Sequence, residues 1–351
     1  MKTLGYAAHS AESPLVPFHF DRREPRANDV VIEILYAGVC HSDLHTVRND
    51  WGGTVYPAIP GHEIVGRVIE TGSDVTKYKV GDNVAVGCLV DGCLECDQCE
   101  KHQEQFCREG LHGTYNAPDR IDGTNNYGGY SRHIVVREEF VLGVPDGMDL
   151  SRAAPILCAG ITTYAPLKRW GVKEGSRVGV IGLGGLGHMA VKLAAAMGAH
   201  VTAISRTADK AEEAAEMGAH GLLISGDAAA MQAASMTFDV IIDTVPVKHD
   251  LNPYMPLLDI DGMLVIVGQL GPVGEFNTAT SVLHRTGVVG SLIGGIAETQ
   301  EVLDFCAEKG VLPECEMIAI QDINEAYDRL EKGDVRYRFV IDMASLEAEM
   351  A

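Results

Sequence analysis

Hydrophobic and polar residues follow two different patterns along the chain, and the change falls near residue 150. From Val30 to about Val144, short β-rich runs are separated by Gly, Asp and Asn. The runs occupy residues 30–35, 64–69 and 83–86, with turn signals at residues 71–74 and 80–82. Short strands with closely spaced turns predict a small, irregular antiparallel β domain or barrel.

After Pro145-Asp146-Gly147, apolar strand patterns alternate with alanine-rich helical patterns. Each helical pattern ends at Met-Gly-Ala, where Gly198 or Gly218 occupies the position after a helix end that glycine favours. The alternation predicts βαβ units around a parallel sheet. Strands are expected at residues 177–182, 200–205, 222–224, 240–243 and 263–267, and helices at 188–197 and 208–217.

This alternation stops near Gly290, and a strand expected at residues 337–341 returns to the first domain. We therefore predict an α/β protein with two domains. Residues 1–150 plus 290–351 form a mostly β domain, and residues 151–289 form a Rossmann-type, doubly wound parallel-sheet domain. The apolar window 178–196 could suggest a membrane span, but its five glycines and strand-like start favour a buried strand, turn and helix.

The charge of the chain argues against some classes of partner, and its cysteine content argues for metal ligation. The chain has 28 Lys and Arg against 49 Asp and Glu, a formal net charge of −21. Such a surface repels phosphate backbones and anionic lipid, so we expect neither nucleic acid nor membrane as a partner. No signal peptide is evident, and nine cysteines then favour metal ligation in a reducing, cytoplasmic compartment over disulfides.

Four of the cysteines form a compact motif with the spacing C-x2-C-x2-C-x7-C. Thiolates two residues apart on a tight turn can converge on one ion, and four of them complete a closed tetrahedral zinc site. The alternatives are an iron–sulfur cluster or a chance group of free thiols, and zinc is favoured because no redox role is otherwise implied. The predicted structural zinc ligands are Cys93, Cys96, Cys99 and Cys107.

A second group of metal-ligand residue types, Cys40, His62 and Cys158, is widely separated in sequence, so spacing alone does not assemble it. Taken singly, each is more often structural than a ligand. The three remaining cysteines are interpreted as small buried hydrophobic residues. They are Cys88, Cys306 and Cys315.

A glycine-rich turn between the strand at 177–182 and the following helix reads Gly182-Leu183-Gly184-Gly185-Leu186-Gly187. In this setting GxGxxG predicts a dinucleotide site: Gly182 permits the tight turn, Gly184 lets the pyrophosphate approach, and Gly187 lets helix pack on strand. The helix N-terminus supplies the local positive field that the acidic surface lacks. A glycine turn without a ligand is the alternative.

The second strand of this domain ends at Ser205-Arg206, where an NAD-specific site presents Asp or Glu. Arg206 can instead pair with a 2′-phosphate, and Lys210 adds a second charge, which favours NADP(H). The alternative is that Arg206 only solvates the start of a helix.

Several motifs occur together in one order: CHSDLHTVRNDWGGTVYPAIPGHEIVG from Cys40, the four-cysteine loop, LCAGITTY from Leu157, and GLGGLGH from Gly182. With Gly61-His62-Glu63-x2-Gly66-x5-Gly72-x2-Val75, they resemble the zinc-dependent medium-chain dehydrogenase/reductase superfamily. The run from Cys40 is similar to its cinnamyl alcohol dehydrogenase branch, especially microbial NADP-dependent aldehyde reductases. The resemblance covers nearly the whole chain and implies a GroES-like catalytic domain beside the Rossmann domain.

The resemblance implies that Cys40, His62 and Cys158 bind a catalytic zinc, with Glu63 beside the metal as an alternative ligand. It assigns Asp43 to orient the histidine ligand. The zinc would act as a Lewis acid on an aldehyde oxygen while the nicotinamide delivers hydride. The proton would pass through Ser42 and His45. His41 would face the pyrophosphate, and Asp50 would be an active-site carboxylate.

The resemblance also implies a cofactor cleft, a substrate pocket and a homodimer with its strand-pairing edge at residues 290–294. Gly113 stands where plant members carry a large aromatic residue, so we expect a more open pocket for aromatic and medium aliphatic aldehydes. Trp51 would wall the pocket, or its contacts are ordinary packing. Further cofactor contacts are expected from Thr162, Asp243, Thr244, Val267-Gly268, Ser291–Ile293 and Arg338.

These residues predict a zinc-dependent, NADP(H)-linked alcohol dehydrogenase or aldehyde reductase. One alternative is an NAD-linked polyol or sugar dehydrogenase of the same superfamily, which Ser205-Arg206 disfavours. The other is a non-catalytic protein that binds zinc and a dinucleotide, which the joint presence of Cys40, His62, Cys158, Ser42 and His45 disfavours.

Overall fold

The computed structural model describes residues 1–349, and these residues form two compact units. Unit 1 contains Met1–Cys158, Gly294–Ala307 and the segment from Leu312 onward. Unit 2 contains Ala159–Ile293 and Glu308–Val311. Each unit has its own main sheet.

Unit 1 is built on a mostly antiparallel sheet with the order β16-β17-β3-β4-β5-β9, in which β8 also pairs with β3. The central strand β3 is a run of branched and aromatic residues with few polar interruptions, as a strand covered on both faces requires. The strands are β3 (Asp29–Gly38), β4 (Ile64–Thr71), β5 (Asn83–Val86), β8 (His133–Arg137), β9 (Leu142–Gly143), β16 (Cys315–Ala319) and β17 (Arg338–Asp342).

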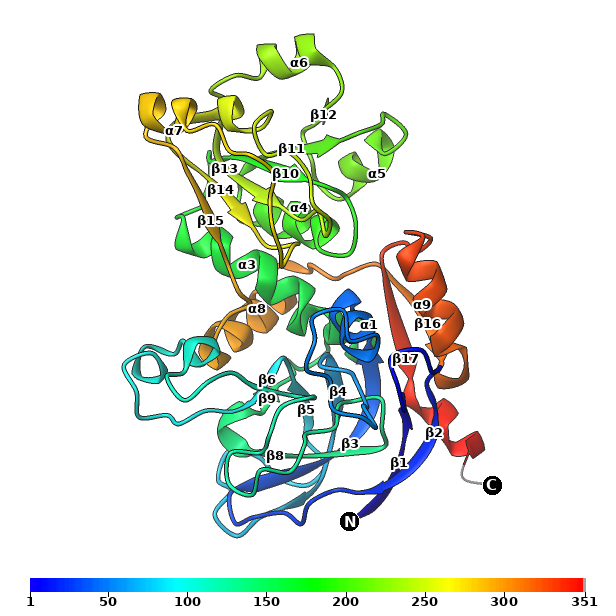
Figure 1. Cartoon of the computed structure of the whole chain (residues 1–351). Coiled ribbons are helices and arrows are strands. Elements are labelled where there is room, and N and C mark those ends of the chain that lie inside the picture. The colour runs from blue at the N-terminus through cyan, green and yellow to red at the C-terminus, as the bar shows by residue number, and fades with distance from the viewer. Residues whose placement is uncertain (350–351) are drawn as a thin grey trace. The chain divides into compact units, whose positions relative to one another are not determined.

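The predicted antiparallel β domain is therefore confirmed, together with the return of the C-terminal strand. Val340 of β17 pairs with Gly38 of β3, and Figure 1 shows the red β17 beside the blue β3. Two smaller antiparallel pairs complete the strands of this unit. They are β1 (Lys2–Ala7) with β2 (Val16–Asp21), and β6 (Leu89–Asp91) with β7 (His112–Gly113).

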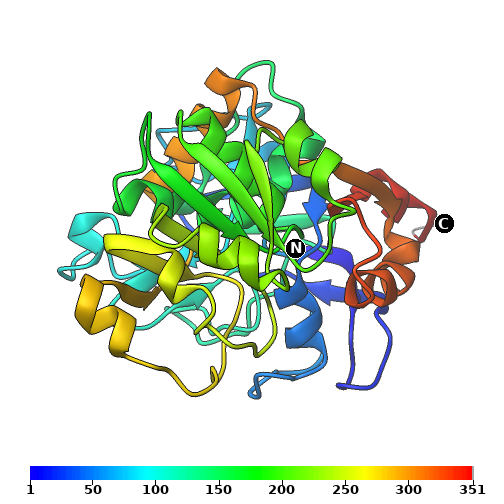
Figure 2. The same ribbon diagram turned by 90° about the horizontal axis from the view of Figure 1, so that it is seen from above.

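Unit 2 contains a six-stranded, wholly parallel sheet with the order β12-β11-β10-β13-β14-β15. The order reverses between β10 and β13, which is the doubly wound arrangement predicted from the sequence. Figure 2 shows these strands side by side from above. The strands are β10 (Arg177–Ile181), β11 (His200–Ser205), β12 (Gly221–Ile224), β13 (Phe238–Asp243), β14 (Leu258–Ile266) and β15 (Gly287–Gly290).

The helices agree with the sequence pattern in part. The predicted helix at 188–197 is α4 (Gly187–Ala196), but the one at 208–217 begins only at Ala211 because residues 206–210 form a turn and a bend. The sequence pattern did not predict a helix at His41 or at Ala159. The α-helices other than α4 are α1 (His41–Val47), α2 (Leu150–Ala153), α3 (Ala159–Arg169), α5 (Ala211–Glu216), α6 (Ala228–Ala233), α7 (Ala279–His284), α8 (Ile296–Lys309) and α9 (Ile323–Glu331).

Short 3-10 turns connect many of these elements. They are η1 (Cys99–Lys101), η2 (Glu104–Phe106), η3 (Glu138–Phe140), η4 (Ala154–Leu157), η5 (Met255–Leu257), η6 (Ile320–Asp322) and η7 (Met343–Glu349). Within residues 1–349, no helix is long and apolar enough to cross a membrane. The apolar window 178–196 divides into β10, the glycine turn and α4, as expected.

Candidate active site

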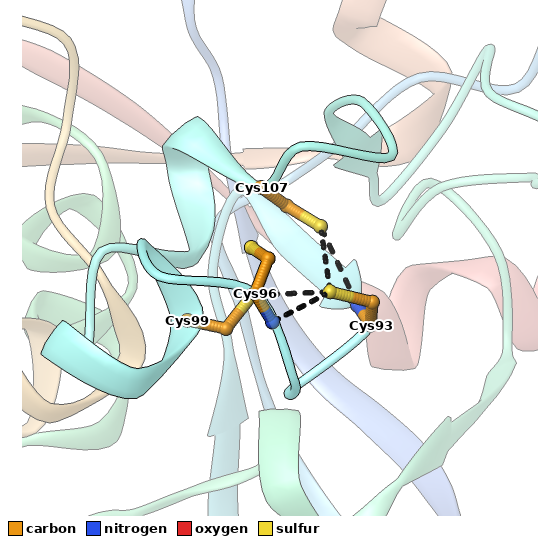
Figure 3. Close-up of side chains that lie close together, drawn as sticks. All are labelled: Cys93, Cys96, Cys99 and Cys107. Carbon is orange, nitrogen blue, oxygen red and sulfur yellow. Dashed lines mark hydrogen bonds between the residues drawn. The ribbon is translucent and has the colours of Figure 1, made fainter.

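Four cysteine sulfurs meet in the loop between β6 and β7, and we call this group the four-sulfur cluster (Figure 3). Cys93 and Cys96 lie before η1, Cys99 begins η1, and Cys107 follows η2. The Sγ atom of Cys93 lies 3.9 Å from that of Cys99 and 3.5 Å from that of Cys107. These separations far exceed the roughly 2.05 Å of a disulfide bond, so the sulfurs are grouped without being joined.

Backbone amides surround the four-sulfur cluster with donors. The amide N–H of Cys96 lies 3.3 Å from the sulfur of Cys93, and the amide of Cys93 lies 3.4 Å from the sulfur of Cys107. The amide of Arg108 donates to the sulfur of Cys96 at 3.4 Å. Donors of this kind favour the thiolate form, which is the form that binds metal.

A second group of ligand atoms comes from Cys40, His62, Glu63 and Cys158, and we call it the mixed cluster. All four residues are buried, and their ligand atoms lie within 4.8 Å of one another. The sulfurs of Cys40 and Cys158 are 3.9 Å apart. The structure thus brings together four side chains whose sequence positions span more than a hundred residues.

The pairing of β3 with β4 explains how the mixed cluster forms. These strands are antiparallel and Ala37 pairs with Ile64, so the residues just after β3 and just before β4 emerge at the same edge of the sheet. Cys40 follows β3 as the residue just before α1, and His62 lies two residues before the start of β4. Cys158 closes the short turn η4, which packs on β3 and β4.

Asp43 is the fully buried centre of the hydrogen bonds behind this cluster. Its Oδ1 accepts from Nδ1 of His62 at 2.9 Å and from the amide of Gly61 at 3.0 Å. Its Oδ2 accepts from the amide of Cys40 at 3.0 Å and from the hydroxyl of Tyr130 at 3.1 Å. With Nδ1 of His62 donating to Asp43, the Nε2 of His62 is the nitrogen left with a lone pair for a metal.

Glu63 and Arg338 form a buried ion pair beside the cluster. A guanidinium nitrogen of Arg338 donates to Oε1 of Glu63, while the buried Oε2 has no hydrogen-bond partner among residues 1–349. Burial raises the pKa of Glu63 to about 7, although the charge of Arg338 acts in the opposite direction. Gly38 makes room for this carboxylate, because a Cβ at that position would lie 2.0 Å from Oε2.

The helix α1 carries the residues expected to move protons. The hydroxyl of Ser42 lies 3.7 Å from the sulfur of Cys40. One turn later, Nδ1 of His45 lies 2.7 Å from the carboxylate of Asp50, and its ring lies 5.2 Å from that of Trp51. Trp51 is half exposed.

Two nearby residues were not singled out from the sequence, and a third, Cys88, was expected to be a small buried hydrophobic residue but is only partly buried. The ring of Tyr115 lies 5.6 Å from that of His62, two residues beyond Gly113. Tyr130 completes the donors to Asp43. The thiol of Cys88 lies 3.7 Å from the carbonyl oxygen of Leu157, next to Cys158, so its surroundings are those of the mixed cluster. Long-range folding brings these side chains here, and no local motif marks them.

His41 precedes Ser42 at the start of α1, and burial lowers the pKa of its imidazole, whereas the charge of Cys40 acts to raise it. Its ring lies 6.2 Å from that of His45. The predicted residues of α1 therefore lie together, next to the mixed cluster.

In unit 2 the glycine turn joins β10 to α4. Gly182 has φ of +88°, a conformation that favours glycine, and a Cβ at Gly187 would lie 2.0 Å from the carbonyl oxygen of Gly182. A Cβ at Gly184 would meet nothing within 4 Å. The hydroxyl of Thr244 donates to the carbonyl oxygen of Ile181 at 2.7 Å and so fastens the turn to the end of β13. Gly185 and Leu186 lead directly into α4.

The two expected cations lie near the end of β11. The ammonium group of Lys210 donates to the carbonyl oxygen of Leu183 at 3.3 Å, within the glycine turn. Arg206 is exposed, and Ser205 accepts from the amide of Thr207 at 3.4 Å. Of the other predicted contacts in unit 2, Thr162 is buried on α3, Gly268 donates its amide to Asp243, and Ser291 and Ile293 follow β15.

Comparison with known proteins adds the family context. The family model described as an alcohol dehydrogenase GroES-like domain matches residues 26–146, and that described as a zinc-binding dehydrogenase matches residues 185–308. The NADP-dependent alcohol dehydrogenase C 1 of Mycolicibacterium smegmatis is 52% identical over 344 residues, covering 98% of each chain. Aldehyde reductase YahK of Escherichia coli is 49% identical, covering 99% of each.

Among solved structures, a cinnamyl alcohol dehydrogenase of Sorghum bicolor superposes with a TM-score of 0.94. The two chains are 43% identical, and the match covers 98% of each.

Proposed function

The chain belongs to the zinc-binding alcohol dehydrogenase family, and we propose that it interconverts primary alcohols and aldehydes with NADP(H) as hydride carrier. The observation that carries this proposal is the mixed cluster, in which two cysteines and a histidine converge beside a carboxylate whose Oε2 has no hydrogen-bond partner within residues 1–349. Three protein ligands with a fourth position open to exchange are typical of catalytic rather than structural zinc.

The sulfur separations fit zinc at both clusters. A tetrahedral ion with bonds of about 2.3 Å to sulfur requires sulfurs about 3.8 Å apart. The recorded separations are 3.5 Å and 3.9 Å in the four-sulfur cluster and 3.9 Å in the mixed cluster. We therefore assign a structural zinc to the first cluster and a catalytic zinc to the second.

In the mixed cluster, Cys40, His62 and Cys158 would hold the metal, and the free Oε2 of Glu63 would compete with substrate for the fourth position. A zinc ion bound there supplies Lewis-acid polarisation of the substrate oxygen. Asp43 fixes the tautomer and orientation of His62, so that the metal-facing nitrogen keeps its lone pair. Arg338 holds the other oxygen of Glu63 and limits its movement.

Proton movement would use α1. Ser42 lies beside Cys40, so its hydroxyl stands next to the position of a substrate oxygen. His45 is partly exposed, so its ring can exchange protons with water. Its Nδ1 atom lies 2.7 Å from the carboxylate of Asp50, so Asp50 would hold the imidazole in place at this end of the relay.

The residues of unit 2 fit a dinucleotide, with residues 151–289 as the binding domain and residues 1–150 plus 290–351 as the catalytic domain. The open space at Gly184 suits a pyrophosphate that approaches the backbone, and the start of α4 offers it the positive end of the helix dipole. Lys210 already contacts the glycine turn, and Arg206 follows the strand end where a 2′-phosphate would lie. The remaining cofactor contacts are proposed as the sequence predicted them: His41, Thr162, Thr244, Gly268, Ser291, Ile293 and Arg338.

The substrate class would be aromatic, cinnamyl-type and medium aliphatic aldehydes and their alcohols. The lack of a side chain at Gly113 leaves space beside the carbonyl oxygen of Tyr115, and the half-exposed Trp51 offers an apolar wall next to His45. Broad specificity would be contradicted if one aldehyde were turned over far faster than all others tested.

We further propose a cytoplasmic homodimer. The strand β15 lies at an edge of the parallel sheet, and neighbouring α7 exposes Val282 and Leu283 at 76% and 77%. A sheet edge beside exposed apolar side chains favours pairing with a second copy of the chain.

The decisive test is the ratio of kcat/KM for NADPH over NADH with cinnamaldehyde as substrate. We expect a ratio of about 100 or more, because a hydrogen bond between charged groups such as Arg and phosphate is worth about 1.5–3 kcal/mol. A ratio near or below one would overturn the NADP(H) assignment and favour an NAD-linked polyol dehydrogenase. Bound zinc and cofactor without turnover of any aldehyde or alcohol would instead support a non-catalytic binding protein.

A further inference from the structure

Arg22 is a buried arginine whose hydrogen bonds involve no acidic side chain. It directly follows β2, and its side chain is buried. Among residues 1–349, its side chain donates four hydrogen bonds, and all of them go to uncharged oxygens. Burial, and after it the charge of Arg23, lowers the pKa of Arg22 to about 9, so the guanidinium group stays charged at neutral pH. A buried charge without a counter-charge is costly unless hydrogen bonds satisfy it, so these four bonds hold Arg22 in place.

The four oxygens that accept from this guanidinium group belong to one stretch of chain, which we call the 127–133 segment. The Nη2 atom donates to the carbonyl oxygen of Gly128 and to the hydroxyl of Ser131, both at 2.8 Å. The Nε atom donates to the carbonyl oxygen of His133 at 2.8 Å, and Nη1 donates to that of Tyr127. The planar guanidinium group thus binds both ends of the segment at once.

The other side of this segment is bound to the residues that lead into β4. Three consecutive amides, those of residues 128–130, donate to the carbonyl oxygens of residues 59–61 at 2.7–3.0 Å. A Cβ at Gly61 would lie 2.9 Å from the amide nitrogens of Gly129 and Tyr130. The two stretches of backbone therefore lie in close contact directly before the histidine of the mixed cluster.

Two peptide groups connect Arg22 to these backbone bonds. A peptide group is planar, so its carbonyl and its amide turn together. The group between residues 127 and 128 accepts from Arg22 and donates to Ile59, and the next group accepts from Arg22 and donates to Gly61. Without the guanidinium group, each buried oxygen would turn toward water or another donor, and its amide would turn with it. Arg22 therefore sets the direction of the amides that bind Ile59 and Gly61.

The later part of the segment is held in a different way. Tyr130 accepts from the amide of Tyr6, and the amide of Arg132 donates to Leu4, so both residues are bridged to β1. The arginine is thus needed for the orientation of residues 127–129 and not for the attachment of the whole segment.

Gly61 connects these peptide groups to the mixed cluster. Its carbonyl oxygen accepts from the amide of Gly129 at 2.8 Å, and its own amide donates to Oδ1 of Asp43 at 3.0 Å. The same Oδ1 accepts from Nδ1 of His62 at 2.9 Å. Because His62 is the next residue in the chain, a turn of the backbone at Gly61 changes both the position of the histidine and its bond to the carboxylate that orients its ring.

We propose that Arg22 is a positioning residue for the mixed cluster. It orients the two peptide groups that hold the backbone before His62, and so fixes the direction in which His62 presents Nε2 to a metal. This inference rests on the proposed zinc at the mixed cluster, but the effect of Arg22 on Gly61 can be tested without metal.

The first experiment replaces the zinc of the full chain by Co²⁺ and compares Arg22→Lys with the wild type. Lysine keeps the charge but lacks the planar fork of donors, so it cannot bind four oxygens at once. The visible absorption bands of bound Co²⁺ depend on the geometry of its ligands, and the spectrum of Cys158→Ser identifies the bands of the mixed cluster. We expect these bands to shift in Arg22→Lys, and the affinity of the mixed cluster for Zn²⁺ to fall by about tenfold, the lower end of the effect of losing a group that orients a ligand.

Arg177→Lys is the matched control. Arg177 donates to Asp239 and Asp259 within unit 2, so its replacement also removes several bonds of an arginine but leaves unit 1 unchanged. It should keep the wild-type cobalt spectrum, whatever its effect on the melting temperature. If Arg22→Lys does not fold, Ser131→Ala takes its place, because it removes one acceptor of Arg22 and should shift the bands less but in the same way. Unshifted bands in the folded variant would mean that Arg22 only stabilises the fold, and the inference would be wrong.

The second experiment measures hydrogen exchange of the Gly61 amide in the metal-free chain. Exchange that is faster in Arg22→Lys than in the wild type and in Arg177→Lys supports the inference, and equal exchange overturns it. A wild-type chain that binds metal only at the four-sulfur cluster would count against the proposed function, while the exchange of Gly61 would still decide the role of Arg22.

Discussion

At the scale of single residues, Asp43 has the most demanding position in unit 1. It is fully buried and accepts from four donors, two of them the amides of Gly61 and Cys40 and the others His62 and Tyr130. A carboxylate can satisfy all four because both of its oxygens accept. The residue therefore links the shape of the backbone around the mixed cluster to the orientation of its histidine.

Replacing Asp43 by Asn should lower zinc affinity at the mixed cluster by about 10- to 100-fold, the usual effect of losing such a partner. The amide group would turn N–H donors toward two of the existing donors and leave them unpaired. Competition with a chelator, followed as zinc content per chain, measures the effect. The exposed Asp74→Asn is the control and should retain both zinc ions. Equal zinc retention by Asp43→Asn would contradict the structural argument.

The residue scale also shows where prediction from sequence stops. Cys40, His62 and Cys158 were grouped only through family resemblance, because their meeting depends on the pairing of β3 with β4 and on the turn η4. Nothing local marks Tyr130 as a donor to Asp43, or Arg338 as the partner of Glu63. Arg338 was expected to reach a cofactor phosphate, and that contact stays a prediction.

At the scale of elements, the junction of β10 with α4 combines two different uses of glycine. The Cβ of an alanine at Gly187 would lie 2.0 Å from the carbonyl oxygen of Gly182, so that glycine is required for packing. An added Cβ at Gly184 meets nothing within 4 Å, so that position is open where the cofactor is expected. Within one turn, Gly187 is therefore needed for folding, and Gly184 is expected to be needed for binding of the cofactor.

Gly187→Ala should therefore destabilise the protein by roughly 1–3 kcal/mol, the usual cost of forcing an extra carbon into a packed site. Gly184→Ala should leave the melting temperature of the cofactor-free protein unchanged and raise the Kd for NADPH by about tenfold or more, because the methyl group would occupy the pyrophosphate position. Thermal unfolding and cofactor titration of both variants distinguish the two effects. A destabilised Gly184→Ala protein that bound NADPH normally would refute the assignment.

Elements with a clear pattern of apolar residues could be predicted from the sequence, and elements shaped by tertiary contacts could not. The strands β3, β10 and β13 are apolar runs, and their patterns were recognised. The sequence pattern does not predict the helix α1 because His41–Val47 is short and mostly polar. Its start is capped by the local contact between the amide of Cys40 and the carboxylate of Asp43, but Cys40 is not the Ser or Thr by which such a cap is usually recognised. The helix α5 begins later than its pattern suggested because residues 206–210 form the turn that presents Lys210 to Leu183.

At the scale of the whole molecule, the net charge of −21 would repel a phosphorylated cofactor at long range. The groups that would attract the cofactor phosphates are local instead. The start of α4, Lys210 and Arg206 all lie at the same end of the parallel sheet. The overall charge therefore argues against nucleic acid as a partner without excluding a nucleotide, since long-range repulsion and local attraction act over different distances.

The surface of unit 2 also predicts that two copies of the chain form a dimer through α7 and β15. Leu283→Glu places a charge on α7, where Val282 and Leu283 are three-quarters exposed in the single chain next to the edge strand β15. A charge buried in a dimer interface is costly unless it is paired, so we expect the variant to dissociate into monomers while keeping its fold. Sedimentation velocity at several concentrations measures the change. The control Ile121→Glu alters a side chain of similar exposure in unit 1 and should remain dimeric. If the wild-type chain sediments as a monomer, or if Leu283→Glu remains a dimer, α7 and β15 do not form the contact, and their exposed apolar residues require another partner.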